Sequence, residues 1–235
     1  MTMRRAGGQH SLPCLTMGAM DMKILEAQRL RRSLYRLTLD SGEELPIDKR
    51  TFDESPYRVG GQIDAEQLAA LTAQSVYNRA HDTALYWLGQ RDLSGRELEK
   101  KLAAGETPPE VAAAVVERLR QVGLLDDAAY ARRAARSLAQ YKQYPRRRVE
   151  QELLRRGIDR QTAREAVEET DSDDFQQALA LVQKKYYNKL TDRDLRQKTV
   201  AALARRGYSF EVARRAVETA AQTQTDAEET DEEWL

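Results

Sequence analysis

The apolar residues between positions 64 and 221 recur three and four positions apart, which is the spacing of one face of an α-helix. Leu98 and Leu102 follow this spacing, and so do Val111, Val115 and Leu119. Glycine, proline and acidic residues, which favour helix ends and helix starts, separate the apolar runs. The pattern therefore predicts a succession of amphipathic helices joined by short connections.

Helix start signals divide this succession into units. Ser94 and Glu97 have the spacing of a capping box, in which the hydroxyl and the carboxylate each accept a hydrogen bond from a backbone N–H group. Asp82 and Thr107 are expected to begin two further helices in the same way. Together these signals predict a first three-helix repeat over residues 82–125.

The same arrangement recurs twice towards the C-terminus. Arg155-Arg156-Gly157 matches Arg205-Arg206-Gly207, and Ala163-Arg164 matches Ala213-Arg214, both with an offset of 50 residues. Chance is a poor explanation for two matches in one register. The sequence therefore predicts two more repeats of the same kind.

The predicted fold class is all-α, with three tandem three-helix repeats in an elongated array, preceded by a small N-terminal region that contains a β-hairpin. The hairpin is predicted because apolar residues alternate on either side of Ser41-Gly42. Stacked repeats bury their apolar faces against one another and present a long surface. The predicted segments are a disordered extension (1–21), the hairpin region (22–63), a linking helix (64–81), the three repeats (82–125, 126–170 and 171–221) and an acidic disordered tail (222–235).

Charge is segregated along the chain. The 235 residues include 38 basic and 38 acidic side chains, but six of the acidic ones and none of the basic ones lie after Ala221. Residues 1–221 therefore carry a net charge of +6. A basic folded part favours an acidic partner such as a nucleic acid.

The sequence offers little for catalysis or for a cofactor. One cysteine and two histidines are too few for a structural zinc site or a disulfide framework. There is no phosphate-binding G-x-x-x-x-G-K loop, and His81 beside Asp82 is the one general-base candidate. We expect a non-enzymatic cytoplasmic monomer that holds no cofactor or metal and does not enter a membrane, since no apolar run reaches the length of a transmembrane helix.

Thirteen basic residues are candidates for contact with a partner or with DNA. They concentrate in the second repeat and continue into the third, and a solvated face interleaved with Glu150 and Glu152 is the alternative interpretation. Tyr141, Tyr144 and Tyr187 are weaker candidates for stacking on bases, because Tyr141 also fits the core spacing. The basic candidates are Arg132, Arg133, Arg136, Lys142, Arg146, Arg147, Arg148, Arg155, Arg156, Lys184, Lys185, Arg205 and Arg206.

Two stretches of the second repeat resemble a known family. Gly123-Leu-Leu-Asp-Asp-x-x-Tyr-Ala131, followed by Pro145-Arg-Arg-Arg-Val-x-x-Glu-Leu-x-x-Arg-Gly-Ile158, is similar to the signature of the RecX family of RecA regulators. The resemblance covers roughly residues 82–221. It implies three tandem three-helix repeats that bind along the groove of the RecA filament on single-stranded DNA, inhibiting ATP hydrolysis and strand exchange. On this reading the protein acts in DNA repair, homologous recombination and the SOS response.

The residues themselves leave other functions open. The basic surface suits a sequence-independent binder of single-stranded or double-stranded DNA, whose affinity would fall steeply with salt. An array of helical repeats also suits a scaffold for an unrelated protein.

Overall fold

The computed structural model of the protein describes residues 21–105, 107–190 and 192–232. The chain forms two compact units, residues 1–79 and residues 80–235, which are described separately below. The extension predicted for the first residues of the chain falls almost wholly outside the described residues.

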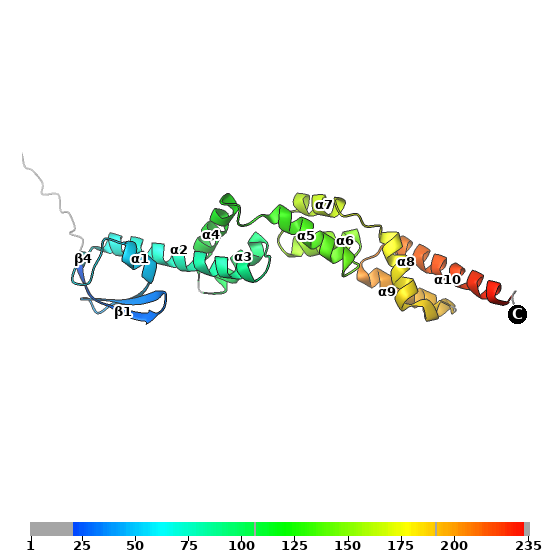
Figure 1. The fold of residues 1–235 in the computed structure, drawn as a ribbon, viewed down its shortest axis with the longest axis horizontal. Coiled ribbons are helices and arrows are strands. Elements are labelled where there is room, and N and C mark those ends of the chain that lie inside the picture. The colour runs from blue at the N-terminus through cyan, green and yellow to red at the C-terminus, as the bar shows by residue number, and fades with distance from the viewer. Residues whose placement is uncertain (1–20, 106, 191, 233–235) are drawn as a thin grey trace, which may run out of the picture. The chain divides into compact units, whose positions relative to one another are not determined.

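The first unit contains a four-stranded antiparallel sheet with the strand order β3-β2-β1-β4 (Figure 1). The predicted hairpin around Ser41-Gly42 is present as β2 and β3, and Gly42 has a φ of 83°, a left-handed conformation that favours glycine. The sheet is larger than the hairpin that the sequence predicted. Its elements are β1 (Met22–Arg31), β2 (Leu34–Leu39), β3 (Glu44–Asp48), the short helix α1 (Lys49–Glu54) and β4 (Gln62–Ile63).

One face of this sheet is covered by helix α2 (Ala65–Gln90). Ile24, Leu37 and Ile47 are fully buried beneath Leu68 and Leu71 of the helix. Burying each such side chain contributes about 1.5–3 kcal/mol, so the helix stabilises a sheet that is small by itself.

Helix α2 is continuous, which corrects one prediction. We expected a linking helix over 64–81 and a new helix beginning at Asp82, but Asp82 lies in the interior of α2. No glycine or proline occurs between Asp64 and Gly89, so nothing ends the helix there. The acidic residue was mistaken for a cap because capping and interior acids look alike in a sequence.

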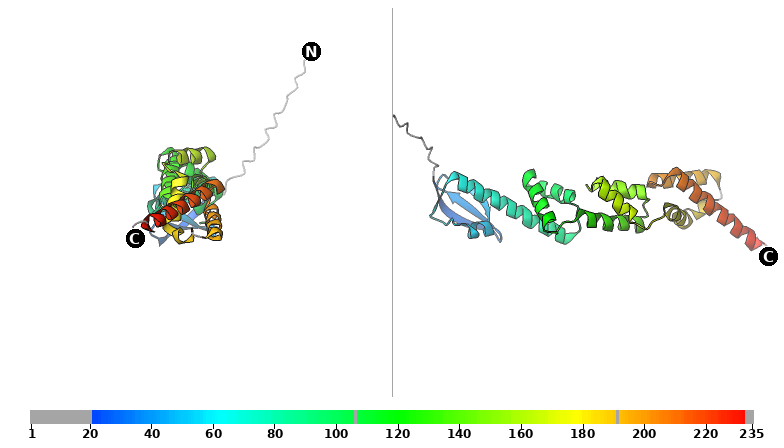
Figure 2. Two further views of the ribbon diagram at one scale, coloured as in Figure 1. Left: turned by 90° about the vertical axis from the view of Figure 1, so that its right-hand side faces the viewer. Right: turned by 90° about the horizontal axis from the view of Figure 1, so that it is seen from above.

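The second unit contains the three helical repeats, which follow one another in chain order (Figures 1 and 2). The fold-class prediction of an all-α chain of three-helix repeats behind a small strand region is thereby confirmed. The helices are α3 (Gly95–Ala103), α4 (Pro109–Gln121), α5 (Asp127–Gln140), α6 (Arg146–Arg155), α7 (Arg160–Glu168), α8 (Asp174–Lys185), the 3-10 helix η1 (Tyr187–Lys189), α9 (Arg193–Arg206) and α10 (Phe210–Glu232).

The predicted capping box at Ser94 is present in full, with reciprocal hydrogen bonds between Ser94 and Glu97. Asp126 caps α5 through the N–H group of Ala129. The cap predicted at Thr107 is absent: α4 begins after Pro108, without a side-chain cap. Proline at the first helical position lacks the N–H group and fixes φ, so this helix start needs less capping than the sequence suggested.

The cores of the second and third repeats use equivalent positions. Leu153, Ile158 and Ala163 are buried in one, and Leu203, Tyr208 and Ala213 are buried in the other. These pairs keep the offset of 50 residues seen in the sequence. The internal repetition therefore describes the hydrophobic cores as well as the helix ends.

Helix α10 continues to Glu232, so the structure does not support a disordered tail from residue 222 within its described part. Ala220, Ala221 and Gln224 remain buried along the helix. No glycine or proline follows Gly207, and the acidic composition alone suggested disorder.

Inter-repeat junctions and a candidate partner-binding surface

Basic and polar residues join the first repeat to the second. The first N–H group of α3, on Gly95, donates to the carboxylate of Asp127 at 2.8 Å, and the Ser94 hydroxyl donates to the carbonyl of Arg156 at 2.5 Å. Arg156 in turn donates to the Tyr130 hydroxyl at 3.1 Å. The junction is therefore a continuous set of hydrogen bonds.

Tyr130 extends this set into the first repeat, because its hydroxyl donates to the carboxylate of Glu97 at 3.0 Å. Burial raises the pKa of the Tyr130 hydroxyl, and the neighbouring Arg156 guanidinium opposes that change. Tyr130 therefore stays protonated and able to donate at neutral pH.

The second and third repeats are joined in the same way. The first N–H group of α6, on Arg146, donates to the carboxylate of Asp174 at 3.0 Å, just as Gly95 donates to Asp127. The Arg148 guanidinium donates to the carbonyl of Arg206 at 3.0 Å. The first and second repeats thus each bind an acidic side chain and a helix C-terminus of the repeat that follows.

A glycine makes room for an arginine at each junction. Gly157, with a φ of 87°, lies so close to Arg96 that an added Cβ would be 2.4 Å from the Arg96 Cβ. Gly207 lies against Arg148 in the same manner, with 3.0 Å for the equivalent distance. The glycine that ends a helix in one repeat is therefore also a packing surface for the preceding repeat.

Five of the thirteen candidate cations are bound within these junctions or within their own repeat. Arg146 donates through Nε to the carbonyl of Ser172 at 3.0 Å, in addition to its main-chain bond. The remaining bound side chains are Arg133 with Asp92 (2.9 Å), Arg148 with the Arg206 carbonyl (3.0 Å), Arg155 with Glu152 (2.6 Å) and Arg156 with Tyr130 (3.1 Å). These contacts could not be predicted from the sequence, because the partners lie 26 to 58 residues away, except for Glu152.

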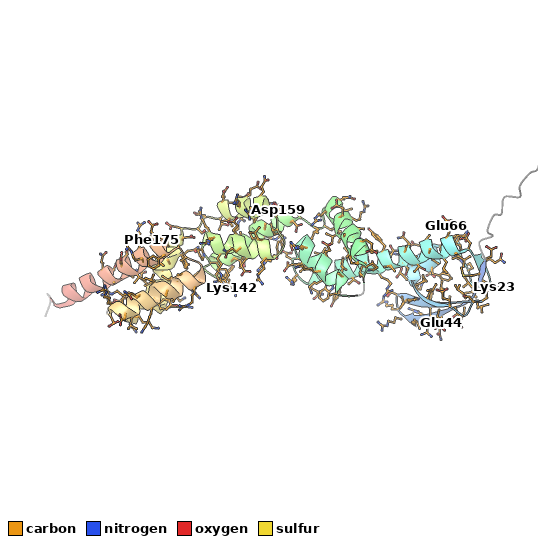
Figure 3. The ribbon with its side chains drawn as sticks, turned by 180° about the vertical axis from the view of Figure 1, so that it is seen from behind. Lys23, Glu44, Glu66, Lys142, Asp159 and Phe175 are labelled. Carbon is orange, nitrogen blue, oxygen red and sulfur yellow. The ribbon has the colours of Figure 1, made fainter. Side chains whose placement is uncertain are left out.

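The other eight candidates form no side-chain hydrogen bond or ion pair within the part of the chain that the structure describes. Lys142 is one of them, and Figure 3 shows it on the second repeat, away from Asp159 of the same repeat. Charged groups left in solvent are free to bind a partner. The eight are Arg132, Arg136, Lys142, Arg147, Lys184, Lys185, Arg205 and Arg206.

Two of these unpaired residues, Arg147 and Arg205, face a groove between α6 and α9. The groove has a volume of about 500 Å³ and lies at the junction of the second and third repeats. Its basic lining also includes Arg148 and Arg155, and Glu152 is the one acidic residue that lines it. Since Arg155 already binds Glu152, the groove keeps a marked positive charge.

The three candidate tyrosines have different surroundings. Tyr141 is 82% exposed at the end of α5, so it lies outside the core whose spacing it fits. Helical spacing fails here because α5 ends at Gln140. Tyr144 is covered by Arg148, whose guanidinium lies 4.1 Å from the ring centroid, while Tyr187 is 43% exposed.

The described residues contain no cluster of three or more histidine, cysteine, aspartate or glutamate side chains able to hold a metal ion. Within the same ranges, no helix is long and apolar enough to span a membrane.

Comparison with known proteins also finds three three-helix domains in this chain. Models of the first, second and third three-helix domains of RecX match residues 80–119, 126–167 and 171–217. "Regulatory protein RecX" of Clostridioides difficile is 25% identical over 194 residues, covering 81% of this chain and 91% of that protein. The protein of the same name from Levilactobacillus brevis is 28% identical over 214 residues, covering 90% and 79%.

Solved structures of RecX have the same fold. One is 24% identical with a TM-score of 0.61, covering 81% of this chain and 96% of the other. RecX from Lactobacillus salivarius is 20% identical with a TM-score of 0.55, covering 62% and 96%. With three consecutive domain models matched over more than half of its length, the chain belongs to the RecX family.

Proposed function

We propose that this chain is a cytoplasmic regulator of RecA that acts by binding and not by catalysis. In this proposal it lies along the groove of the RecA filament on single-stranded DNA and inhibits ATP hydrolysis and strand exchange. The observation that carries the proposal is the tandem match of all three RecX domain models. The relatives named "Regulatory protein RecX" also support a regulatory function.

The junctions suggest how such a chain would act. Gly95 and Arg146 make equivalent bonds to Asp127 and Asp174, so successive repeats are joined through the same atoms. A filament also presents the same surface again and again. Repeats that contact neighbouring protomers would resist the relative movements that ATP hydrolysis and strand exchange require.

The unpaired cations would supply contacts to acidic groups of the filament. Arg147 and Arg205 are the strongest candidates, because both line the groove at the second junction and neither is bound within the described residues. Guanidinium groups form strong, paired hydrogen bonds with carboxylates and phosphates alike. The same residues therefore suit either the protein or the DNA of the filament.

The decisive experiment measures ATP hydrolysis by RecA on single-stranded DNA while this protein is added. Hydrolysis should fall to a low plateau, and strand exchange should fall with it. Rates that stay unchanged once the protein is in excess over RecA would contradict the proposal.

A sequence-independent DNA-binding protein is the second candidate, favoured by the eight unpaired cations. Binding to naked single-stranded DNA and to preformed RecA filament should be compared at rising salt. Electrostatic DNA binding weakens steeply with salt. A preference for the filament that persists supports the first proposal, whereas a preference that disappears supports the second.

A further inference from the structure

The β1–β2 hairpin of the first unit ends in a cluster of arginines outside the three matched RecX domains. Arg29, Arg31 and Arg32 are all exposed, and no acidic residue lies between Gln28 and Leu39. The hairpin belongs to the sheet shown in blue in Figure 1. From this cluster we infer that the hairpin tip is a separate binding element for the phosphate backbone of a nucleic acid.

The tip is held in place. The carbonyl of Ser33, in the turn, accepts a hydrogen bond from the N–H group of Lys49 at 2.9 Å, which fastens the turn to the start of α1. Behind it, the rings of Tyr35 and Phe52 pack edge to face with their centroids 5.9 Å apart. Ordering the tip before binding reduces the entropy lost when a ligand is bound.

One arginine shapes the tip and two are left to bind. The Arg29 guanidinium donates to the carbonyls of Arg31 and Arg32 at 3.3 and 3.4 Å. The side chains of Arg31 and Arg32 have no such bond to any described residue. Arg29 therefore supports the turn, and the other two guanidinium groups remain in solvent.

Glu26 lies on β1 within the hairpin, three residues from Arg29 on the side away from the turn. Two acids of the neighbouring strand β3 are already engaged. Glu44 on β3 pairs with Arg36 at 3.4 Å. Asp48, opposite Leu34 in the sheet, is buried and accepts bonds from the N–H and hydroxyl groups of Thr51. Neither carboxylate neutralises the tip, so its positive charge is available to a ligand.

Turn stability does not explain the arginine in the turn. Tight two-residue hairpins favour Asn-Gly or Asp-Gly because their central residues adopt positive φ. Here Arg32 and Ser33 form the turn, and neither is among the described residues that have a positive φ. The turn sequence thus supplies charge without a conformational advantage.

The surroundings favour phosphate over a protein partner. A protein interface needs an apolar centre inside a polar rim, and the tip offers only Leu30, 41% exposed, between Arg29 and Arg31. Leu30 lies at a register shift of β1, where an extra residue bends the strand. A cationic tip without an apolar patch matches backbone contact that is independent of base sequence.

The test uses the full chain without RecA, so it can fail independently of the proposed function. The variant Arg31→Ala/Arg32→Ala is titrated against a labelled dT oligonucleotide and against a duplex of equal length, at several salt concentrations. Two lost phosphate contacts should reduce the slope of log affinity against log salt by about 1.4 for the single strand and about 1.8 for the duplex. Affinity at low salt should fall about tenfold or more.

Two further variants control for charge and for folding. Lys100→Ala/Arg118→Ala removes the same charge from exposed side chains of the first repeat and should leave the slope unchanged. Arg31→Lys/Arg32→Lys keeps the charge and should keep most of the slope. An unchanged slope in the double alanine variant would overturn the inference.

Discussion

The guanidinium of Arg148 in the second repeat donates to the main-chain carbonyl of Arg206 in the third, across 3.0 Å. It also covers the ring of Tyr144, and the aliphatic part of the same side chain packs against Gly207. The last carbonyls of a helix have no partner within the helix. One arginine therefore completes a helix end in the neighbouring repeat and fixes how the two repeats meet.

The first prediction concerns this contact. Arg148→Ala should lower the free energy of unfolding by about 1–2 kcal/mol, because a charge-assisted hydrogen bond to a helix end is lost. Arg147→Ala is the matched control, since Arg147 lies on the same helix without a bond to any described residue. Chemical denaturation of both variants measures the difference. Equal stabilities would show that the Arg148 contact does not hold the repeats together.

The second prediction separates backbone strain from packing at a helix end. Gly157→Ala and Gly123→Ala both place a side chain at positive φ, with φ values of 87° and 74°. Each substitution should lower the free energy of unfolding by about 1–2 kcal/mol, because a residue with a Cβ is disfavoured in the left-handed conformation. Only Gly157 is crowded, by Arg96, so the free energy of unfolding of its variant should fall by about 1 kcal/mol more. Thermal unfolding of the pair checks this, and equal losses would argue against tight packing at the first junction.

The third prediction concerns alkaline pH. Burial raises the pKa of Tyr208 to about 12, above its value of about 10 in an unfolded chain. The unfolded state then releases the proton first as the pH rises. The contribution of Tyr208 to stability is therefore fully present below pH 10 and is lost as the pH rises towards 12. The decline due to Tyr208 should be at most about 2–3 kcal/mol.

The variant Tyr208→Phe isolates that group from the other tyrosines. Its free energy of unfolding should be about 1 kcal/mol lower at neutral pH, because the hydrogen bond from the Tyr208 hydroxyl to the carbonyl of Gln143 is missing. Between pH 10 and 12 its stability should decline less than that of the unchanged protein. Denaturation curves across this range make the comparison, and parallel declines would contradict the assigned pKa.

Much of the fold follows from local signals in the sequence. Ser94 caps α3 as its position suggested, because a cap bonds to N–H groups two or three residues away. Asp126 and Asp159 cap α5 and α7 with the same local bonds. Asp82 has the same chemistry but lies inside α2. Whether a residue caps depends on whether the helix before it ends, and no breaker ends it there.

The candidate surface was harder to predict than the fold, because the sequence does not show which acidic or carbonyl group each arginine binds. Arg146, Arg147 and Arg148 are adjacent in the sequence, which predicts a contact role for all three. In the structure Arg146 and Arg148 bind the third repeat, whereas Arg147 faces the groove. Their partners are Ser172 and Arg206, and only packing of the repeats brings these within reach. Replacing all three arginines would therefore confuse loss of binding with loss of structure.

The fourth prediction accordingly uses residues that the junctions do not need. Arg147→Ala/Arg205→Ala removes two unpaired cations from the groove between α6 and α9. If the groove contacts the filament, about ten times more of the variant should be needed for half-maximal inhibition of RecA ATP hydrolysis, as expected when about 1.4 kcal/mol of binding free energy is lost. Stability should change by less than about 0.5 kcal/mol, because neither side chain is bound within the described residues.

Two controls make that result specific to the groove. Lys100→Ala/Arg118→Ala removes the same charge from exposed positions of the first repeat, so a general electrostatic effect would weaken both variants equally. Arg155→Ala removes a groove arginine that Glu152 already binds, and it should weaken inhibition less than the double variant does. If inhibition by Arg147→Ala/Arg205→Ala were undiminished, the contact surface would have to lie among Arg132, Arg136, Lys142, Lys184, Lys185 and Arg206. Because those residues lie outside the lining of the groove, the same assay on their variants would then locate the surface.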